Sequence, residues 1–152
     1  MHYDLVIFDL DGTLCDTAPD IRRCLNRALG EFDMPPLSEE VLMAAIGPAG
    51  KAFLKAIVPD GVDLSLAETI VKRYRSYYEV ENTVETKPFP GVVELLEDLK
   101  TAGVPQAVAS NKPLGQVKTI VKGLGLEKYF IDIVGPESVE TVSYTHLTLP
   151  TN

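Results

Sequence analysis

Residues 3–14 of the chain read YDLVIFDLDGTL, and this stretch indicates the fold. Tyr3–Leu10 is a short apolar run rich in Val, Ile and Phe, and it ends in an Asp-Gly pair. A continuous apolar run that stops at a turn signal is typical of a buried strand in a parallel sheet. The stretch therefore predicts a strand whose carboxyl end carries Asp9 and Asp11.

Two later apolar runs have the same character, Val104–Ser110 and Tyr129–Val134. Apolar residues at helical spacing predict one helix over Gly91–Lys100, before these runs, and another over Leu114–Leu124, between them. Helices that alternate with strands in this way form βαβ units. The sequence therefore predicts an α/β core with a parallel sheet.

Residues 16–85 differ from the rest because no convincing strand occurs among them. Helices are expected over residues 21–29, 41–45, 51–58 and 65–78. Ser38 is placed to cap the second of these helices, and residues 87–91, Lys-Pro-Phe-Pro-Gly, are interpreted as the linker that returns to the sheet. The segment predicts an all-helical insertion after the first strand.

Charge and composition exclude several classes of protein. Among 152 residues, 14 are Lys or Arg and 22 are Asp or Glu, so the net charge of −8 lacks the basic footprint of a nonspecific nucleic-acid binder. No apolar run approaches the ~20 residues of a membrane span, and the N-terminus does not resemble a secretory leader. Cys15 and Cys24 are too few for a disulfide framework. We expect reduced thiols, a cytoplasmic location, and neither nucleic acid nor a membrane as partner.

Asp9 and Asp11 are the residues most indicative of chemistry. Carboxylates two residues apart face the same side of an extended chain, at the strand end where open α/β sheets bind ligands. Two anions held together are costly unless a cation compensates them, and Mg²⁺ is usually held by one or two carboxylates, waters and a substrate phosphate. The alternative is a turn with solvated aspartates, but the pattern D-x-D-G-T after a strand favours the metal site.

Residues 6–17, VIFDLDGTLCDT, resemble the first signature of the haloacid dehalogenase-like hydrolases. The resemblance extends from Tyr3 to about Thr141. It implies a Rossmann-like, three-layer parallel core formed by residues 1–15 and 86–141. Residues 16–85 resemble the four-helix cap of the phosphoglycolate phosphatase-like branch.

The resemblance also implies roles for the aspartates. Asp9 stands at the position of the nucleophile that forms an aspartyl phosphate, and Asp11 at that of the general acid that later acts as base. Asp9 and the Asp11 carbonyl would bind Mg²⁺. The implied activity is Mg²⁺-dependent hydrolysis of a small phosphorylated metabolite.

The resemblance also implies roles for further residues, whose motifs are less specific than the first signature. Gly12 and Thr13 would contact the transferring phosphoryl group through backbone amides. Ser110, followed by Asn111, matches the second signature and would bind phosphate. Such a pair alone is more often a turn or helix cap, but the first motif and the spacing favour the phosphate site. Lys112 could add charge, but we do not expect it to be the family's phosphate-binding lysine.

Several positions in the insertion have a structural alternative beside the functional one. Lys51 ends the motif Gly-Pro-Ala-Gly-Lys, which resembles the cap loop that closes over substrate, but a solvated lysine is the simpler interpretation. Asp16 and Thr17 resemble a cap hinge or a helix N-cap. We expect a solvated face for the arginines and packing for the tyrosines. These residues are Arg22, Arg23, Arg27, Tyr74, Tyr77 and Tyr78.

The last segment, Val142–Asn152, contains no Asp, Glu, Lys or Arg. Its sequence, VSYTHLTLPTN, resembles the translation of a transposase adapter used in sequencing libraries; an ordinary terminal strand with turns is the alternative. The resembled family has two further signatures, a lysine in the third and an acidic pair in the fourth, and both are missing from this chain. We therefore expect a native chain cut after about Thr141 and little activity from the chain as it stands.

The substrate is not specified by these motifs. A 5′-nucleotidase, a pyrophosphatase and a phosphomutase share the same core signatures, so they remain alternatives to a phosphoglycolate phosphatase-like enzyme. A non-catalytic phosphate-binding module with the same fold is an alternative of another class, but the presence of both Asp9 and Asp11 favours an enzyme.

Overall fold

The computed structural model describes residues 3–45, 57 and 61–138. In chain order its elements are β1 (Val6–Phe8), β2 (Cys15–Asp16), α1 (Ala18–Gly30), α2 (Glu39–Ala45), α4 (Leu64–Glu81), β3 (Lys87–Pro88), α5 (Val92–Thr101), β4 (Gln106–Ala109), α6 (Leu114–Gly123) and β5 (Asp132–Val134). Short 3₁₀ turns cover Glu127–Tyr129 and Pro136–Ser138.

A parallel sheet with the order β1-β4-β5 forms one half of the molecule. Phe8 is in register with Val108, and Ala109 with Val134, so the residues that follow each strand meet at one edge. The parallel sheet and the helices α5 and α6 confirm the predicted α/β core. The strands are shorter than predicted, and Tyr129 lies in a 3₁₀ turn rather than in β5.

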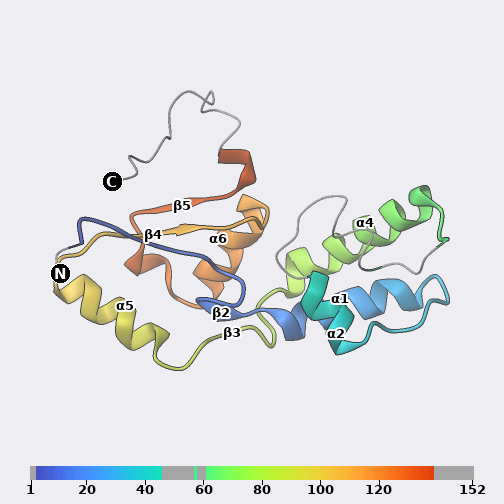
Figure 1. The fold of residues 1–152 in the computed structure, drawn as a ribbon, viewed down its shortest axis with the longest axis horizontal. Coiled ribbons are helices and arrows are strands. Elements are labelled where there is room, and N and C mark those ends of the chain that lie inside the picture. The colour runs from blue at the N-terminus through green and yellow to red at the C-terminus, as the bar shows by residue number, and fades with distance from the viewer. Residues whose placement is uncertain (1–2, 46–56, 58–60, 139–152) are drawn as a thin grey trace, which may run out of the picture.

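Both α5 and α6 lie on the same side of this sheet (Figure 1). Leu96 of α5 and Val117, Ile120 and Val121 of α6 are buried against it. Ile7 of β1 is 60% exposed, so the expectation of a fully buried first strand is wrong. The physical reason is that none of the described elements covers the other side of β1.

The helices α1, α2 and α4 lie beyond the carboxyl ends of the strands and form a separate helical unit (Figure 1). The predicted apolar stripe of α1 is buried, and α1 packs against α4. The Ser38 hydroxyl accepts a hydrogen bond from the Val41 amide at 3.3 Å, which confirms the predicted cap of α2. The helix expected over 51–58 lies outside the described residues, apart from Ile57, which is helical and buried.

An antiparallel pair of two-residue strands, β2 and β3, joins the helical unit to the sheet. Cys15 is in register with Pro88 and Asp16 with Lys87. The sequence analysis did not predict this pair and interpreted residues 87–91 as a simple linker. Strands of two residues carry too little periodicity to be recognised in a sequence.

Beside this junction, Asp20 ties α1 to the returning chain. Its fully buried carboxylate accepts hydrogen bonds from the Thr86 amide (2.9 Å), the Thr86 hydroxyl (2.8 Å) and the Glu85 amide (3.0 Å). Arg23 donates to the same carboxylate at 2.8 Å and also pairs with Glu81. The expectation of a solvated arginine face is therefore wrong for Arg23, because the buried charge of Asp20 needs a cationic partner.

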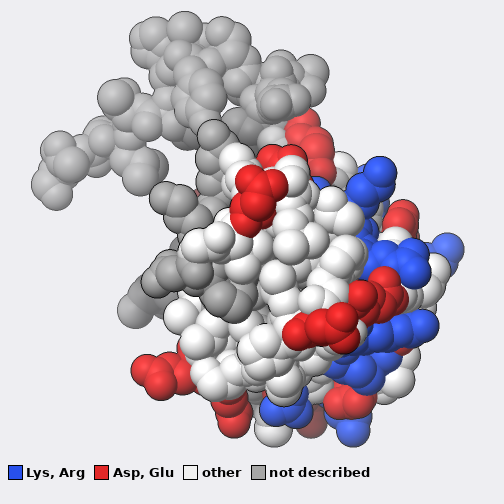
Figure 2. Space-filling model, turned by 90° about the vertical axis from the view of Figure 1, so that its right-hand side faces the viewer, with Lys and Arg blue, Asp and Glu red and all other residues white. Residues whose placement is uncertain are grey.

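The outer surface of the helical unit carries both signs of charge. Figure 2, which views this end of the molecule, shows lysine and arginine side chains along one side with acidic side chains between them. Arg27 pairs with Glu81 at 3.0 Å and Arg73 with Glu31 at 2.6 Å. Among the helices that the structure describes, none combines the length and apolar character needed to cross a membrane.

Candidate active site

Asp9 follows β1 directly and stands at the exposed edge of the sheet. Its Oδ1 accepts a hydrogen bond from the Leu10 amide at 2.7 Å. The chain then turns sharply, with the Leu14 and Cys15 amides both donating to the Leu10 carbonyl. Gly12 has φ +76°, a conformation that glycine adopts without steric cost, and so this turn explains the Asp-Gly pair.

The side chain of Asp11 is held at both of its oxygens. The Thr17 hydroxyl donates to Oδ1 at 2.6 Å, and the Lys112 ammonium lies 3.0 Å from Oδ2. The carboxylate is 13% exposed, so it is largely withdrawn from solvent but open on one side. Contacts at both oxygens hold this carboxyl group in a fixed orientation.

Ser110 and Asn111 follow β4 and therefore lie at the same sheet edge as Asp9. The Ser110 amide continues the sheet by donating to the Val134 carbonyl at 3.1 Å, and its hydroxyl accepts from the Lys112 amide at 3.3 Å. The hydroxyl thus supports a turn and does not cap α6. The amide of Leu114, at the start of α6, donates instead to a Glu137 carboxylate oxygen at 2.9 Å.

Thr17 and Lys112 contact Asp11 in the structure, although neither was predicted from the sequence to do so. Thr17 is the N-cap residue of α1, as one of the two interpretations predicted, but its side chain makes no capping hydrogen bond and its hydroxyl donates to Asp11 instead. At the same helix start, Asp16 accepts a hydrogen bond from the Ala18 amide at 3.3 Å. Lys112 is 7% exposed, whereas the sequence analysis predicted only that it could add charge near Ser110. The only sequence signal for Lys112 is its position two residues after Ser110.

Cys15 lies next to Asp11 but is not a candidate nucleophile. Burial, and to a lesser degree the Asp11 charge, raises the pKa of the Cys15 thiol to about 12. The thiol is therefore protonated at neutral pH, and a protonated thiol is a poor nucleophile. The cysteines of the described chain are free, in agreement with the expectation of reduced thiols.

The oxygen atoms at this corner suit a hard divalent cation. Asp9 offers a carboxylate with one oxygen not engaged by the Leu10 amide, and the Asp11 carbonyl accepts no hydrogen bond from the described residues. Within residues 3–45, 57 and 61–138, no group of three His, Cys, Asp or Glu side chains is placed to hold a metal. The donor set therefore fits Mg²⁺ held by one carboxylate, a carbonyl, water and phosphate, the kind of site that this ion accepts.

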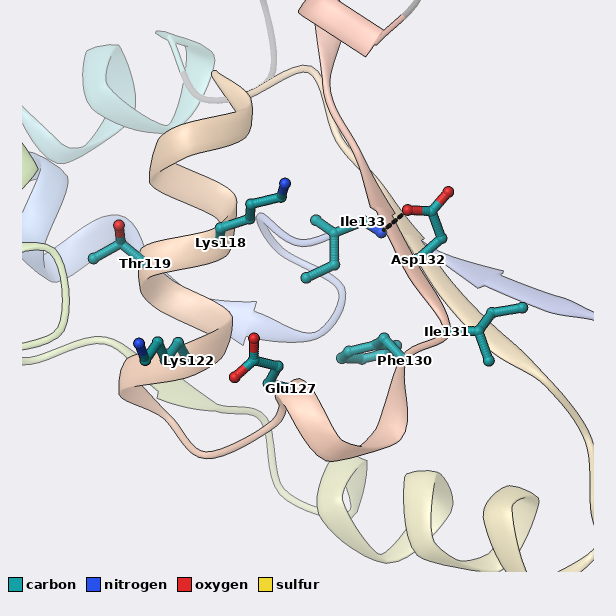
Figure 3. Close-up of a pocket in the computed structure, with 8 residues that line it drawn as sticks. All are labelled: Lys118, Thr119, Lys122, Glu127, Phe130, Ile131, Asp132 and Ile133. Atoms are coloured by element: carbon teal, nitrogen blue, oxygen red, sulfur yellow. Dashed lines mark hydrogen bonds between the residues drawn. The ribbon is translucent and has the colours of Figure 1, made fainter.

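A separate hollow of about 480 Å³ lies between α6 and β5. Lys118, Thr119 and Lys122 line it from α6, and Ile133 lines it from β5 (Figure 3). None of the residues at the Asp9 edge lines this hollow, so it is not part of the candidate site. The predicted substrate contact Lys51 and the segment 142–152 lie outside the described residues.

Comparisons with known proteins identify relatives that match most of the chain. Residues 6–143 match the family model described as haloacid dehalogenase-like hydrolase. A phosphoglycolate phosphatase from Caulobacter vibrioides is 36% identical over 135 residues, which cover 87% of this chain and 57% of that protein. The chain spans about three fifths of the length of the curated relatives it matches.

Solved structures give the same result for the fold. A predicted phosphoglycolate phosphatase from Haemophilus somnus 129pt superposes with a TM-score of 0.83 at 29% identity, covering 90% of this chain and 64% of that one. A predicted phosphatase from Clostridium acetobutylicum has a TM-score of 0.75 at 32% identity and covers 89% and 62% of the two chains.

Proposed function

The chain belongs to the haloacid dehalogenase-like hydrolases, and on that premise we propose that it carries the nucleophile and the general acid of a phosphomonoester hydrolase. The observation that supports this most is the corner after β1, where Asp9 is exposed and Asp11 is fixed by Thr17 and Lys112. The relatives named phosphoglycolate phosphatase support a small phosphorylated metabolite as substrate.

In the proposed first step, a carboxylate oxygen of Asp9 attacks phosphorus and forms a new P–O bond. The bond between phosphorus and the ester oxygen breaks, and its electron pair stays on that oxygen. The Asp11 carboxyl group donates its proton to the leaving oxygen, which departs as an alcohol. The products are the free alcohol and a phosphorylated Asp9.

In the proposed second step, the Asp11 carboxylate takes a proton from water. The water oxygen bonds to phosphorus, and the bond to Asp9 breaks, which restores the Asp9 carboxylate and releases inorganic phosphate. The contacts at both Asp11 oxygens support this role, because they fix the orientation of the group that exchanges the proton in both steps.

We propose Mg²⁺ as the cofactor, held by Asp9 and the Asp11 carbonyl. When bound, the ion would neutralise charge on the phosphoryl oxygens. Gly12, Thr13 and Ser110 surround the same corner, and we assign them the contacts to phosphate, with Asn111 beside them. Residues 16–85 are proposed to act as a cap over the site, with Lys51 as a contact to substrate.

The proposal is tested by Asp9→Asn, because an amide is a poor nucleophile. We expect rapid-quench trapping to find labelled aspartyl phosphate in the parent protein and none in the variant. Asp132→Asn is a matched control: Asp132 is also exposed and also accepts from the amide of its next residue, at 2.8 Å, but lies in β5. Near-parental turnover by Asp9→Asn, or label on Ser110, would refute the assignment.

The assay is best run on the complete reading frame of the source genome beside residues 1–152. That residues 1–152 alone turn over slowly stays a prediction, and comparable rates from the two proteins would contradict it. A phosphomutase, a 5′-nucleotidase or a pyrophosphatase would share the Asp9 intermediate. Product analysis with sugar phosphates, nucleotides, pyrophosphate and phosphoglycolate separates these alternatives.

A further inference from the structure

Lys112 is a buried cation whose placement the hydrolase signatures do not explain. Its side chain is 7% exposed, and lysine is rarely buried to this extent without a partner. That partner is Asp11, with Nζ 3.0 Å from Oδ2. The loop after β4 therefore reaches across to the residue that we propose as general acid.

The same ammonium group also touches the helical unit. Nζ lies 4.9 Å from the centre of the Tyr78 ring, within the range of a cation–π interaction. Tyr78 belongs to α4 and is fully buried, and its hydroxyl has no hydrogen-bond partner among the described residues. The ring of Tyr78, not its hydroxyl, is therefore what α4 offers to Lys112.

This contact crosses the junction between the two parts of the molecule. The chain passes from the sheet to the helical unit through β2 and β3, and the strands point their carboxyl ends toward that unit (Figure 1). Lys112 lies on the sheet side and Tyr78 on the helical side. Asp11 is thus held by Thr17, at the start of α1, and by a lysine that rests on α4.

We propose that Lys112 is a positioning residue for Asp11, and that it couples the orientation of the Asp11 carboxylate to the placement of α4 through the Tyr78 ring. The functional part of this inference rests on the proposed hydrolase activity. A shift of the helical unit would remove the ring beneath the ammonium and loosen its hold on Oδ2. Asp11 would then be aligned for proton transfer only when the helical unit holds the Tyr78 ring against Lys112.

The structural half of the proposal is tested by NMR on residues 1–152. The methylene protons next to Lys112 Nζ are expected to show an upfield ring-current shift. Tyr78→Leu should abolish this shift, whereas Tyr78→Phe should keep it because the ring remains. Tyr77→Leu is the control, since the Tyr77 ring lies against Arg27 instead. A shift that survives in Tyr78→Leu, or is lost in Tyr78→Phe with the fold intact, would overturn the contact.

The functional half is tested by kinetics of Lys112→Met in the complete protein. We expect kcat for an alkyl phosphate to fall about tenfold or more, because a misplaced acid protonates the leaving oxygen poorly. For p-nitrophenyl phosphate, whose leaving group needs little protonation, the rate of the first step, measured as the pre-steady-state burst of alcohol release, should change less than for the alkyl phosphate, and KM should change little for either substrate. Lys112→Arg should recover part of the rate, and Lys118→Met, an exposed lysine of α6, should behave as the parent.

The outcomes separate this proposal from the proposed function. Asp11 also acts as base in the second step, which both substrates share, so the comparison uses the rate of the first step. Equal losses of the first-step rate with both substrates, or a rise in KM alone, would show that Lys112 binds the substrate phosphate and does not position Asp11. A parent protein without phosphatase activity but with the Tyr78-dependent shift would refute the hydrolase and retain the Lys112–Tyr78 contact. An active parent without that shift would refute the coupling alone.

Discussion

Asp11 and Asp20 are two carboxylates with similar partners and different surroundings. Each accepts one threonine hydroxyl and pairs with one cation: Thr17 and Lys112 for Asp11, Thr86 and Arg23 for Asp20. Asp20 also accepts the amides of Glu85 and Thr86 and is fully buried. Among the described residues, none donates a backbone amide to the Asp11 carboxylate, and this side chain stays 13% exposed at the sheet edge.

This difference indicates different tasks. A carboxylate that is saturated with donors and enclosed cannot exchange protons with a ligand, but it holds two segments together. A carboxylate fixed at two points and open on one side is oriented and still reachable. We therefore interpret Asp20 as a structural clamp at the base of the helical unit and Asp11 as the chemically active counterpart.

The largest expected effect that separates the two is on catalysis. Asp11→Asn should lower kcat of the complete protein by about 10²–10⁴-fold, because the amide can neither donate the proton nor take one from water. The urea midpoint should also fall, since the amide leaves the buried Lys112 ammonium without a carboxylate partner, so kcat is measured at a temperature where the variant is shown to be folded. A variant that keeps its activity, or that loses it only by unfolding, would contradict the active role.

The next effect is on stability, and it concerns Asp20. Asp20→Ala leaves two amides and part of the Arg23 charge without their acceptor, which should cost about 3 kcal/mol in the free energy of unfolding. The measurement is urea denaturation followed by circular dichroism. Asp98→Ala, at an exposed carboxylate of α5 outside this network, is the control. A loss of less than about 1 kcal/mol would show that the clamp is not structural.

A third effect is the pH dependence of that stability. Burial alone would raise the pKa of Asp20, but hydrogen bonds from Arg23, Thr86 and Glu85 outweigh it and hold this pKa below its usual value of 3.8. The stabilisation is therefore complete above the unfolded pKa and is lost as the pH falls through the lower, folded pKa. The difference in urea midpoint between the parent and Asp20→Asn should shrink below about pH 4. A difference that stays constant in acid would contradict the lowered pKa.

The local features of the fold could be predicted from the sequence, because they repeat along the chain. Ile21, Cys24, Leu25 and Leu29 recur at helical spacing and form the buried side of α1. The apolar run around Val108 became the buried strand β4. Asp9 could be placed at a sheet edge because a strand and a glycine turn surround it.

The partners of the site could not be predicted, because they depend on contacts between distant residues. Asp20 looks in the sequence like an ordinary acidic residue in the first turn of a helix, yet its partner Thr86 follows 66 residues later. In the same way, the sequence does not reveal that Lys112 and Thr17 contact Asp11. Only the folded chain shows that a hydroxyl and a cation from separate segments meet at one carboxylate.

The smallest expected effect is also the sharpest comparison, because it uses one substitution at two matched sites. Thr17 and Thr86 are both buried, and each donates its hydroxyl to one of the two carboxylates. Thr86→Val should lower the free energy of unfolding by about 1 kcal/mol, the net value of one such hydrogen bond, and leave kcat nearly unchanged. Thr17→Val removes a similar bond, so its stability loss should be comparable. Its kcat should fall as well, by about tenfold, because Asp11 is then held at one oxygen only. If both variants lose stability and neither loses rate, Thr17 is structural too, and the distinction between the two carboxylates does not extend to their hydroxyl partners.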